Sequence, residues 1–93
     1  MQAYRRPLRK REPILIHMEI LASLFESPKN ITRLAQACNV NFGRIEHYTD
    51  SLMAKGLLKT EPGEEGVKLY SITQEGYKVY SDWLDIWRKL PLD

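Results

Sequence analysis

Hydrogen-bonding side chains recur at helical spacing in the middle of this chain, and their chemistry suits contact with DNA bases. Asn41, Arg44, His47 and Ser51 are three or four residues apart, which places them along one side of a helix. An arginine can form a bidentate contact with guanine, and an asparagine can form one with adenine. His47 and Ser51 can reach base edges or phosphates, and Gly43 would let the helix approach a DNA backbone closely.

The other side of the same helix carries residues suited to a core. With about 100° of rotation per residue, the inward positions are Ile45, Tyr48, Thr49 and Leu52, with Phe42 and Met53 at the border. Acidic Glu46 and Asp50 share the outward side, where they repel phosphate and oppose nonspecific binding. A carboxylate can accept a hydrogen bond from cytosine, which favours selective binding. The alternative is that this side is only a solvated surface.

A helix-turn-helix is predicted to position these side chains. Thr32 can cap a short first helix, in which Leu34, Ala35 and Cys38 pack inward. Residues 39–41 form the turn. The helix with the candidate residues then runs from near Asn41 to Gly56, a residue type that commonly ends helices.

A strand-turn-strand pattern follows directly. Strands are predicted over residues 57–61 and 67–72, around a turn rich in proline, glycine and glutamate. A helix-turn-helix followed by a hairpin is the order of a winged-helix domain. We therefore predict an α+β, mainly α fold with three helices, a two-stranded wing and an extra C-terminal helix. Lys59 and Lys68 can offer their charges to phosphates, whereas the acidic tip of the wing should stay out of the groove.

Two further helices flank this unit. The first is predicted over residues 13–27, because Pro13 suits a helix start. Its apolar stripe comprises Ile14, Met18, Leu21 and Phe25, widened by Leu15, Ile20 and Leu24. The last helix covers residues 74–90 with Thr73 as its cap, and its apolar arc spans about half the circumference, more than the ~100° that a surface helix needs.

The width of that arc predicts contact with a second copy of the chain. One side of the last helix can cover the first helix, and the other side needs another surface. Aromatic residues suit the buried centre of an interface. The expected dimer interface comprises Tyr77, Tyr80, Trp83, Leu84, Ile86, Trp87 and Leu90. The alternative is a monomer whose N-terminal arm folds back over this helix.

Positive charge is concentrated at the N-terminus. The net charge is only +2, but five basic residues and no acidic ones lie within the first eleven positions, which leaves a net charge of −3 on the rest. Arg5, Arg6 and Arg9 in this arm could enter a minor groove, as homeodomain arms do. The alternative is a disordered, solubilising tail.

Length and composition indicate one folded domain. Ninety-three residues with 43% apolar and 10% aromatic content fit a basic arm over residues 1–12, a winged-helix domain over 13–73 and a dimerisation helix over 74–93. No run reaches the roughly 18 apolar residues of a membrane span, and no signal peptide is evident, so we expect a cytoplasmic protein.

Catalysis is the least favoured class of function. The sequence has no glycine-rich phosphate loop and no Cys/His metal spacing, so we expect no catalytic residue, cofactor or metal. Glu64 and Glu65 fit a solvated turn, and His17 fits a helix face. The single cysteine, Cys38, is best interpreted as a small buried residue, with a disulfide between two copies as the alternative.

Several runs resemble a known family. The residues C-N-V-N-F at 38–42, then Tyr48, Leu52 and G-L-L at 56–58, resemble the A-N-L-S-Y…Y…L pattern of small archaeal winged-helix proteins. The run S-I-T-Q-E-G at 71–76 matches the L-T-x-x-G step that precedes a long dimerising helix in those proteins. The layout over roughly residues 14–90 is also similar to MarR/SlyA-type regulators and to winged-helix proteins of crenarchaeal viruses, which implies a host cytoplasm if the chain is viral.

The resemblance implies a homodimer on pseudo-palindromic double-stranded DNA, with the helix that carries Asn41, Arg44, His47 and Ser51 in the major groove. The acidic wing tip departs from the family and disfavours contact between the wing tip and DNA. The short last helix implies a compact interface. An architectural, chromatin-like DNA-binding protein and a winged-helix module for protein interaction are the rival functions.

Overall fold

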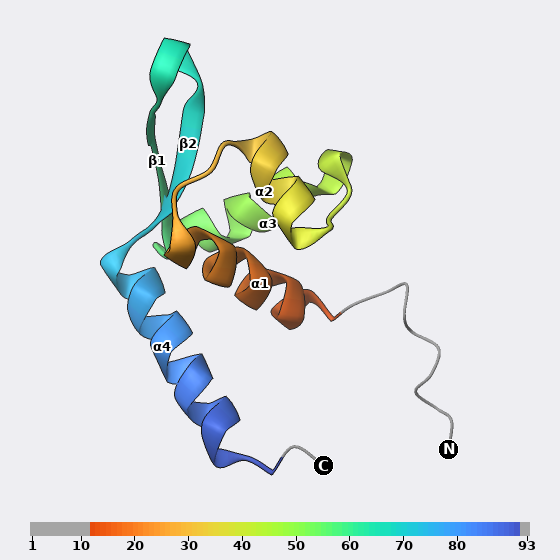
Figure 1. Ribbon diagram of the computed structural model, residues 1–93, viewed down its shortest axis with the longest axis vertical. Coiled ribbons are helices and arrows are strands. Elements are labelled where there is room, and N and C mark those ends of the chain that lie inside the picture. Colours follow the sequence, from red (N-terminus) through yellow and green to blue (C-terminus); the bar gives the residue numbers. More distant parts are fainter. Residues whose placement is uncertain (1–11, 92–93) are drawn as a thin grey trace.

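The computed structural model describes residues 12–91. In chain order the elements are α1 (Pro13–Glu26), α2 (Ile31–Cys38), α3 (Phe42–Ala54), β1 (Leu58–Pro62), β2 (Lys68–Ile72) and α4 (Gln74–Lys89), shown in Figure 1. The strands form a two-stranded antiparallel sheet and are joined by a 3-10 turn at Glu64–Gly66. The predicted fold class is confirmed: the domain is mainly helical, with a helix-turn-helix and a two-stranded wing.

α1 is the central helix of the core. It contacts all three other helices and β2, and Ile16, Met18, Ile20, Leu21 and Leu24 are buried. The predicted stripe was wrong in part, because Ile14, Leu15 and Phe25 are exposed and Ile16 had been left out. A helix that packs against several elements buries more than one stripe, and a single periodicity does not reveal this.

α2 is held by caps at both ends. Its N-cap is Asn30, whose Oδ1 accepts a hydrogen bond from the Arg33 N–H at 2.8 Å, so the prediction of Thr32 as the cap was wrong. At the other end Asn39 adopts a left-handed conformation with φ 55°, and its N–H donates to carbonyls of the last turn. Asparagine tolerates this conformation better than most residues, which makes the sharp turn into α3 possible.

Cys38 lies at the end of α2, inside the core. Its side chain is 4% exposed, and Sγ donates to the Glu19 carbonyl at 3.6 Å. The interpretation as a small buried residue is confirmed. The alternative of a disulfide between two copies is not supported, because another chain cannot reach a thiol enclosed by α1 and α2.

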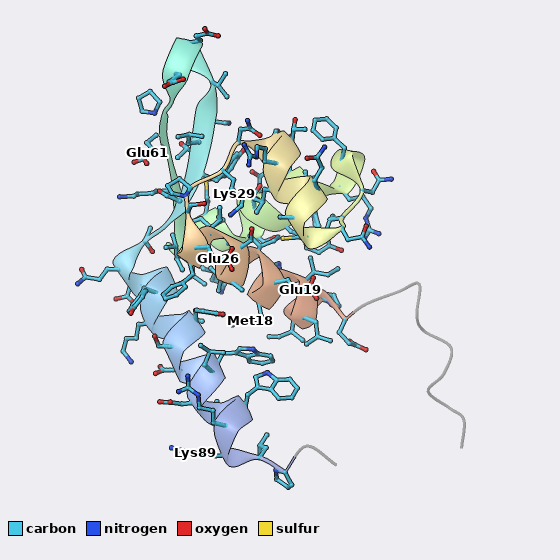
Figure 2. All side chains as sticks on the ribbon, in the orientation of Figure 1. Met18, Glu19, Glu26, Lys29, Glu61 and Lys89 are labelled. Atoms are coloured by element: carbon cyan, nitrogen blue, oxygen red, sulfur yellow. The ribbon has the colours of Figure 1, made fainter. Side chains whose placement is uncertain are left out.

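The wing is attached to the body at its base. Leu58 pairs with Ile72 and Pro62 pairs with Lys68, and Tyr70 and Leu58 are buried against the helices. Lys29, in the loop between α1 and α2, exchanges backbone hydrogen bonds of 3.1 and 2.8 Å with Tyr70. Figure 2 shows Lys29 beside the base of the wing. This bridge fixes the direction of the wing relative to α1 and α2.

α4 begins in a tight junction with the wing. The Thr73 hydroxyl donates to the Gly56 carbonyl at 2.7 Å and accepts from the Gly76 N–H at 3.0 Å, which confirms Thr73 as the cap. A Cβ on Gly76 would overlap the Leu57 carbonyl oxygen and come within 2.8 Å of Ile72 Cγ1. Glycine therefore allows α4 to pack directly on the base of the wing.

Beyond this junction α4 diverges from α1, and its second half extends past the rest of the domain (Figure 1). Within residues 12–91, no helix combines the length and apolar character required to cross a membrane.

Candidate nucleic-acid interface

The outward side of α3 carries the residues predicted to meet DNA. Asn41, Gly43, Arg44, His47 and Ser51 are all exposed, as are Glu46 and Asp50. On the opposite side the predicted core residues Ile45, Tyr48, Thr49 and Leu52 are all buried. The structure thus brings the five predicted residues of α3 and its cap to one accessible surface, which we call the α3 surface.

Asn41 has a structural role at this surface. Its Oδ1 accepts a hydrogen bond of 2.7 Å from the Gly43 N–H and so caps α3. A bidentate contact with adenine needs both the oxygen and the amino group of the amide. Because the cap turns the oxygen toward the end of α3 and uses one of its two lone pairs, the amino group is the part of Asn41 best placed to meet a ligand.

Arg44 is held in position by Tyr48, one turn further along α3. Its Nη2 donates to the Tyr48 hydroxyl at 2.9 Å, and the guanidinium carbon lies 5.7 Å from the centre of the tyrosine ring. Tyr48 is buried and offers a fixed support. Since a guanidinium has five N–H donors in a planar fork, most of the donors of Arg44 are not used by this contact.

Two histidines meet the same tyrosine ring edge to face. His47 on α3 and His17 on α1 have ring centroids 5.3 Å and 5.5 Å from that of Tyr48. His17 Nε2 is buried without a hydrogen-bond partner. Desolvation, and then the charge of His47, lower the pKa of His17 from its ordinary value of 6.5. His17 is therefore neutral at pH 7. From α1 it packs against Tyr48, the residue that holds Arg44.

This lowered pKa predicts a pH-dependent stability. Below pH 6.5 the unfolded chain protonates His17 while the folded chain resists protonation. The contribution of the neutral imidazole is thus fully present above that pH and is lost as the pH falls through the folded pKa. His17→Gln should flatten the fall of unfolding free energy between about pH 7 and pH 5, as measured by urea denaturation.

The matched control for this prediction is His47→Gln. His47 is exposed, and its charge is the smaller cause of the lowered pKa of His17. Its replacement should therefore change the dependence of the unfolding free energy on pH less than His17→Gln does. An identical slope in wild type and His17→Gln would show that His17 does not carry the effect.

Ser51 lies at the edge of the α3 surface. Its hydroxyl donates to the His47 carbonyl at 3.1 Å, so its oxygen is available as an acceptor. The side chain also borders a mainly apolar cavity of about 250 Å³ between α1, α3 and α4. A contact from Ser51 to a base amino group is therefore more favourable than one to a phosphate, which has no proton to donate.

The two wing lysines do not lie together. Lys59 pairs with Ser71 and Lys68 pairs with Pro62, and side chains alternate between the two faces along each strand. The register therefore places Lys59 and Lys68 on opposite faces of the wing. Lys68 lies over the Tyr70 ring, with Nζ 5.4 Å from its centre. Glu64 and Glu65 are exposed at the tip, and Arg5, Arg6 and Arg9 lie outside the described residues.

A second exposed surface runs along α4. Phe25 of α1 stacks on Tyr77 and also meets Tyr80, with 5.2 Å between centroids in both pairs, and Trp83 meets Trp87 edge to face at 5.6 Å. Tyr80, Trp83 and Leu84 are half-buried within the chain. The exposed members are Tyr77, Ile86, Trp87 and Leu90. We call all seven residues the α4 surface.

Sequence reasoning missed two features of the α3 surface. Tyr48 was assigned only to the core, although it also contacts Arg44 and both histidines. Phe42 was placed at the border, yet it is 61% exposed. The sequence carried no signal for the exposure of Phe42, because an apolar residue at the start of a helix can turn toward the core or toward solvent.

Comparisons with known proteins agree on the fold. A family model described as winged helix-turn-helix matches residues 10–90, whereas no curated protein matches the chain. The transcriptional regulator BldR from Sulfolobus solfataricus is 25% identical with a TM-score of 0.73, and 80% of this chain covers 55% of that one. A MarR-family regulator from Silicibacter pomeroyi is 24% identical with a TM-score of 0.70, over 78% of this chain and 51% of that one.

A third similar structure is the homodimeric winged helix-turn-helix DNA-binding domain Mb0332 from Mycobacterium bovis, described as a possible ArsR-family regulator. It is 16% identical with a TM-score of 0.70, over 80% of this chain and 68% of that fragment. The likeness to this structure and to the Silicibacter pomeroyi regulator shows the fold alone. The chain spans about half the length of BldR and of the Silicibacter pomeroyi regulator.

Proposed function

Because the chain belongs to the winged helix-turn-helix family, we propose that it is a transcription regulator that binds double-stranded DNA sequence-specifically as a homodimer. The observation that carries this proposal is the α3 surface, where polar and charged side chains are exposed on the helix that follows the turn. The second helix of such a unit enters the major groove, and its N-terminal residues contact base edges.

In this proposal Arg44 contacts guanine, Asn41 and His47 contact neighbouring base edges or phosphates, and Ser51 contacts a base amino group. Gly43 allows close approach because it has no side chain. Lys59 and Lys68 contact phosphates from opposite faces of the wing, and the arm residues Arg5, Arg6 and Arg9 supply positive charge to the minor groove. Glu46 and Asp50 repel phosphate at mismatched sites and so favour selective binding. We assign no catalytic residue, cofactor or metal.

We assign dimerisation to the C-terminal segment over residues 74–93, which includes α4. Within one subunit α4 buries only its junction residue Gly76 and leaves Ile86 and Trp87 54% and 43% exposed. Monomeric proteins rarely leave large contiguous apolar patches exposed, and Mb0332 is described as homodimeric. Two-fold symmetry would place the two copies of α3 about 34 Å apart, one turn of DNA, on a pseudo-palindromic site.

Selection of bound sequences from a random duplex pool at moderate salt tests this proposal. We expect an inverted repeat whose half-sites are about one helical turn apart. DNA binding without a motif would favour the architectural role. No binding even at low salt, where phosphate contacts are strongest, would favour the protein-interaction module, with which the acidic wing tip is compatible.

Arg44→Ala should weaken binding to the selected site by about 1–3 kcal/mol and relax the preference at one base pair. The physical reason is the loss of a bidentate contact, which lysine cannot replace. Titration of both variants against the site and its single base-pair changes measures the effect. Arg44→Lys is the control, because it keeps the charge and should still lose the preference. An equal loss on every sequence would place Arg44 on a phosphate instead.

A further inference from the structure

The large apolar side chains that are exposed in residues 12–91 form two groups. Eight of them belong to α1, α4 or the C-cap of α4, and the other two are Phe42 and Val67. Phe42 is the most exposed of the ten, at 61%. Four residues of the first group, Tyr77, Ile86, Trp87 and Leu90, belong to the α4 surface, and Phe42 does not.

Phe42 lies at the N-terminal end of α3, and the N-terminal residues of such a helix contact base edges when it enters the major groove. Phe42 occupies the first position of α3, directly after the Asn41 cap. Val40, two residues earlier, packs against the core, whereas the Phe42 ring is exposed. The ring borders a shallow depression between α2 and α3, lined by Thr32, Ala35, Gln36, Asn39 and Val40. This lining covers the ring only in part, because Phe42 is 61% exposed.

We infer that Phe42 contacts the C5-methyl group of a thymine and so helps to select the bound site. The inference rests on the proposed function, because it requires α3 to enter the major groove. Thymine is the base that presents a methyl group there, and an apolar side chain such as phenylalanine is a suitable partner for it. Contact would remove the exposed ring and the methyl group from water together.

The cap of α3 strengthens this assignment. Asn41 is the residue type that would specify adenine, but its Oδ1 is bonded to the Gly43 N–H at 2.7 Å. The cap holds this oxygen against the end of α3, which disfavours a bidentate contact of Asn41 with adenine. A methyl contact from Phe42 recognises an A·T pair through its thymine instead, and it needs no hydrogen bond.

Uracil substitution tests this inference on the full chain with the selected duplex. Deoxyuridine keeps every hydrogen-bonding group of thymine and removes only the methyl group. Replacing the critical thymine should weaken wild-type binding roughly three- to tenfold per half-site, which corresponds to the loss of one buried methyl group. Phe42→Ala should bind the thymine site more weakly and should not discriminate between thymine and uracil there.

Two variants keep the comparison controlled. Phe42→Leu retains an apolar side chain and should stay sensitive to the methyl group. Val67→Ala removes apolar surface from an exposed position on the wing and should leave the discrimination intact. Thermal melting of each variant verifies the fold, which Phe42→Ala should preserve because the ring is mostly exposed.

The outcomes separate the inference from the proposed function. If wild type binds no duplex, the proposed function fails. If wild type binds its site but Phe42→Ala is as sensitive to uracil as wild type, the inference is overturned and the function stands. Unchanged affinity of Phe42→Ala, or a selected half-site without thymine, would overturn it as well.

Discussion

Ile86→Glu is expected to convert the protein into a folded monomer that binds its inverted repeat at least roughly a hundredfold more weakly. Burial of an unpaired carboxylate in an interface costs several kcal/mol, and each 1.4 kcal/mol is a factor of ten. The fold of the subunit should survive, because Ile86 is 54% exposed within one chain. Sedimentation equilibrium measures the dimer, and DNA titration measures the loss of two-site binding.

Val67→Glu is the matched control for this variant. It makes the same apolar-to-acidic change at an exposed position next to the acidic wing tip, so the dimer should persist. Trp83 is a poorer probe, because it is half-buried and packs against the core of its own subunit. If Ile86→Glu remained a dimer, the α4 surface would not be the interface.

Gly76→Ala is expected to destabilise the fold by about 1–3 kcal/mol, the usual range for overpacking a close contact. The added methyl group would overlap the Leu57 carbonyl oxygen and lie 2.8 Å from Ile72 Cγ1. Both neighbours belong to the base of the wing, so relief requires α4 to move away from the sheet. Urea denaturation of wild type and variant measures the change in unfolding free energy.

Gly43→Ala is the control for Gly76→Ala. Gly43 also lies in a helix, but a Cβ there meets only the Asn41 Oδ1, at 3.2 Å, and this side chain is exposed. Alanine favours an α-helix over glycine by roughly 0.5–1 kcal/mol, which offsets the crowding of the Asn41 cap, so Gly43→Ala should destabilise the fold less than Gly76→Ala. If Gly76→Ala were as stable as wild type, the junction between α4 and the wing would be looser than the structure indicates.

Periodicity in the sequence predicted the orientation of α3 well. Ile45, Tyr48, Thr49 and Leu52 were predicted to be inward and are buried. α3 has one core side, so a single 3.6-residue period describes it. The end of α3 and the start of α4 were also predictable, because Gly56 with φ +75° and the Thr73 cap follow local backbone chemistry.

The prediction was weaker wherever an outcome depended on packing between elements. α1 packs against several neighbours at once, so its buried residues did not follow one stripe. Asn30 and Thr32 are both residue types that cap helices well. Asn30 is the cap because α2 begins at Ile31, directly after it. For the same reason, the position of Phe42 at a helix start did not reveal whether its ring turns into the core or toward solvent.

The sequence alone determined the order of elements and the composition of the α3 and α4 surfaces, because helical spacing, caps and turn residues act locally. Only the tertiary structure decided that Arg44 is held by Tyr48, that the cap occupies the Asn41 oxygen, and that Lys59 and Lys68 face opposite ways. These facts depend on which side-chain atoms meet and on the strand register. Neither can be read from residue spacing, because both arise when separate elements pack together.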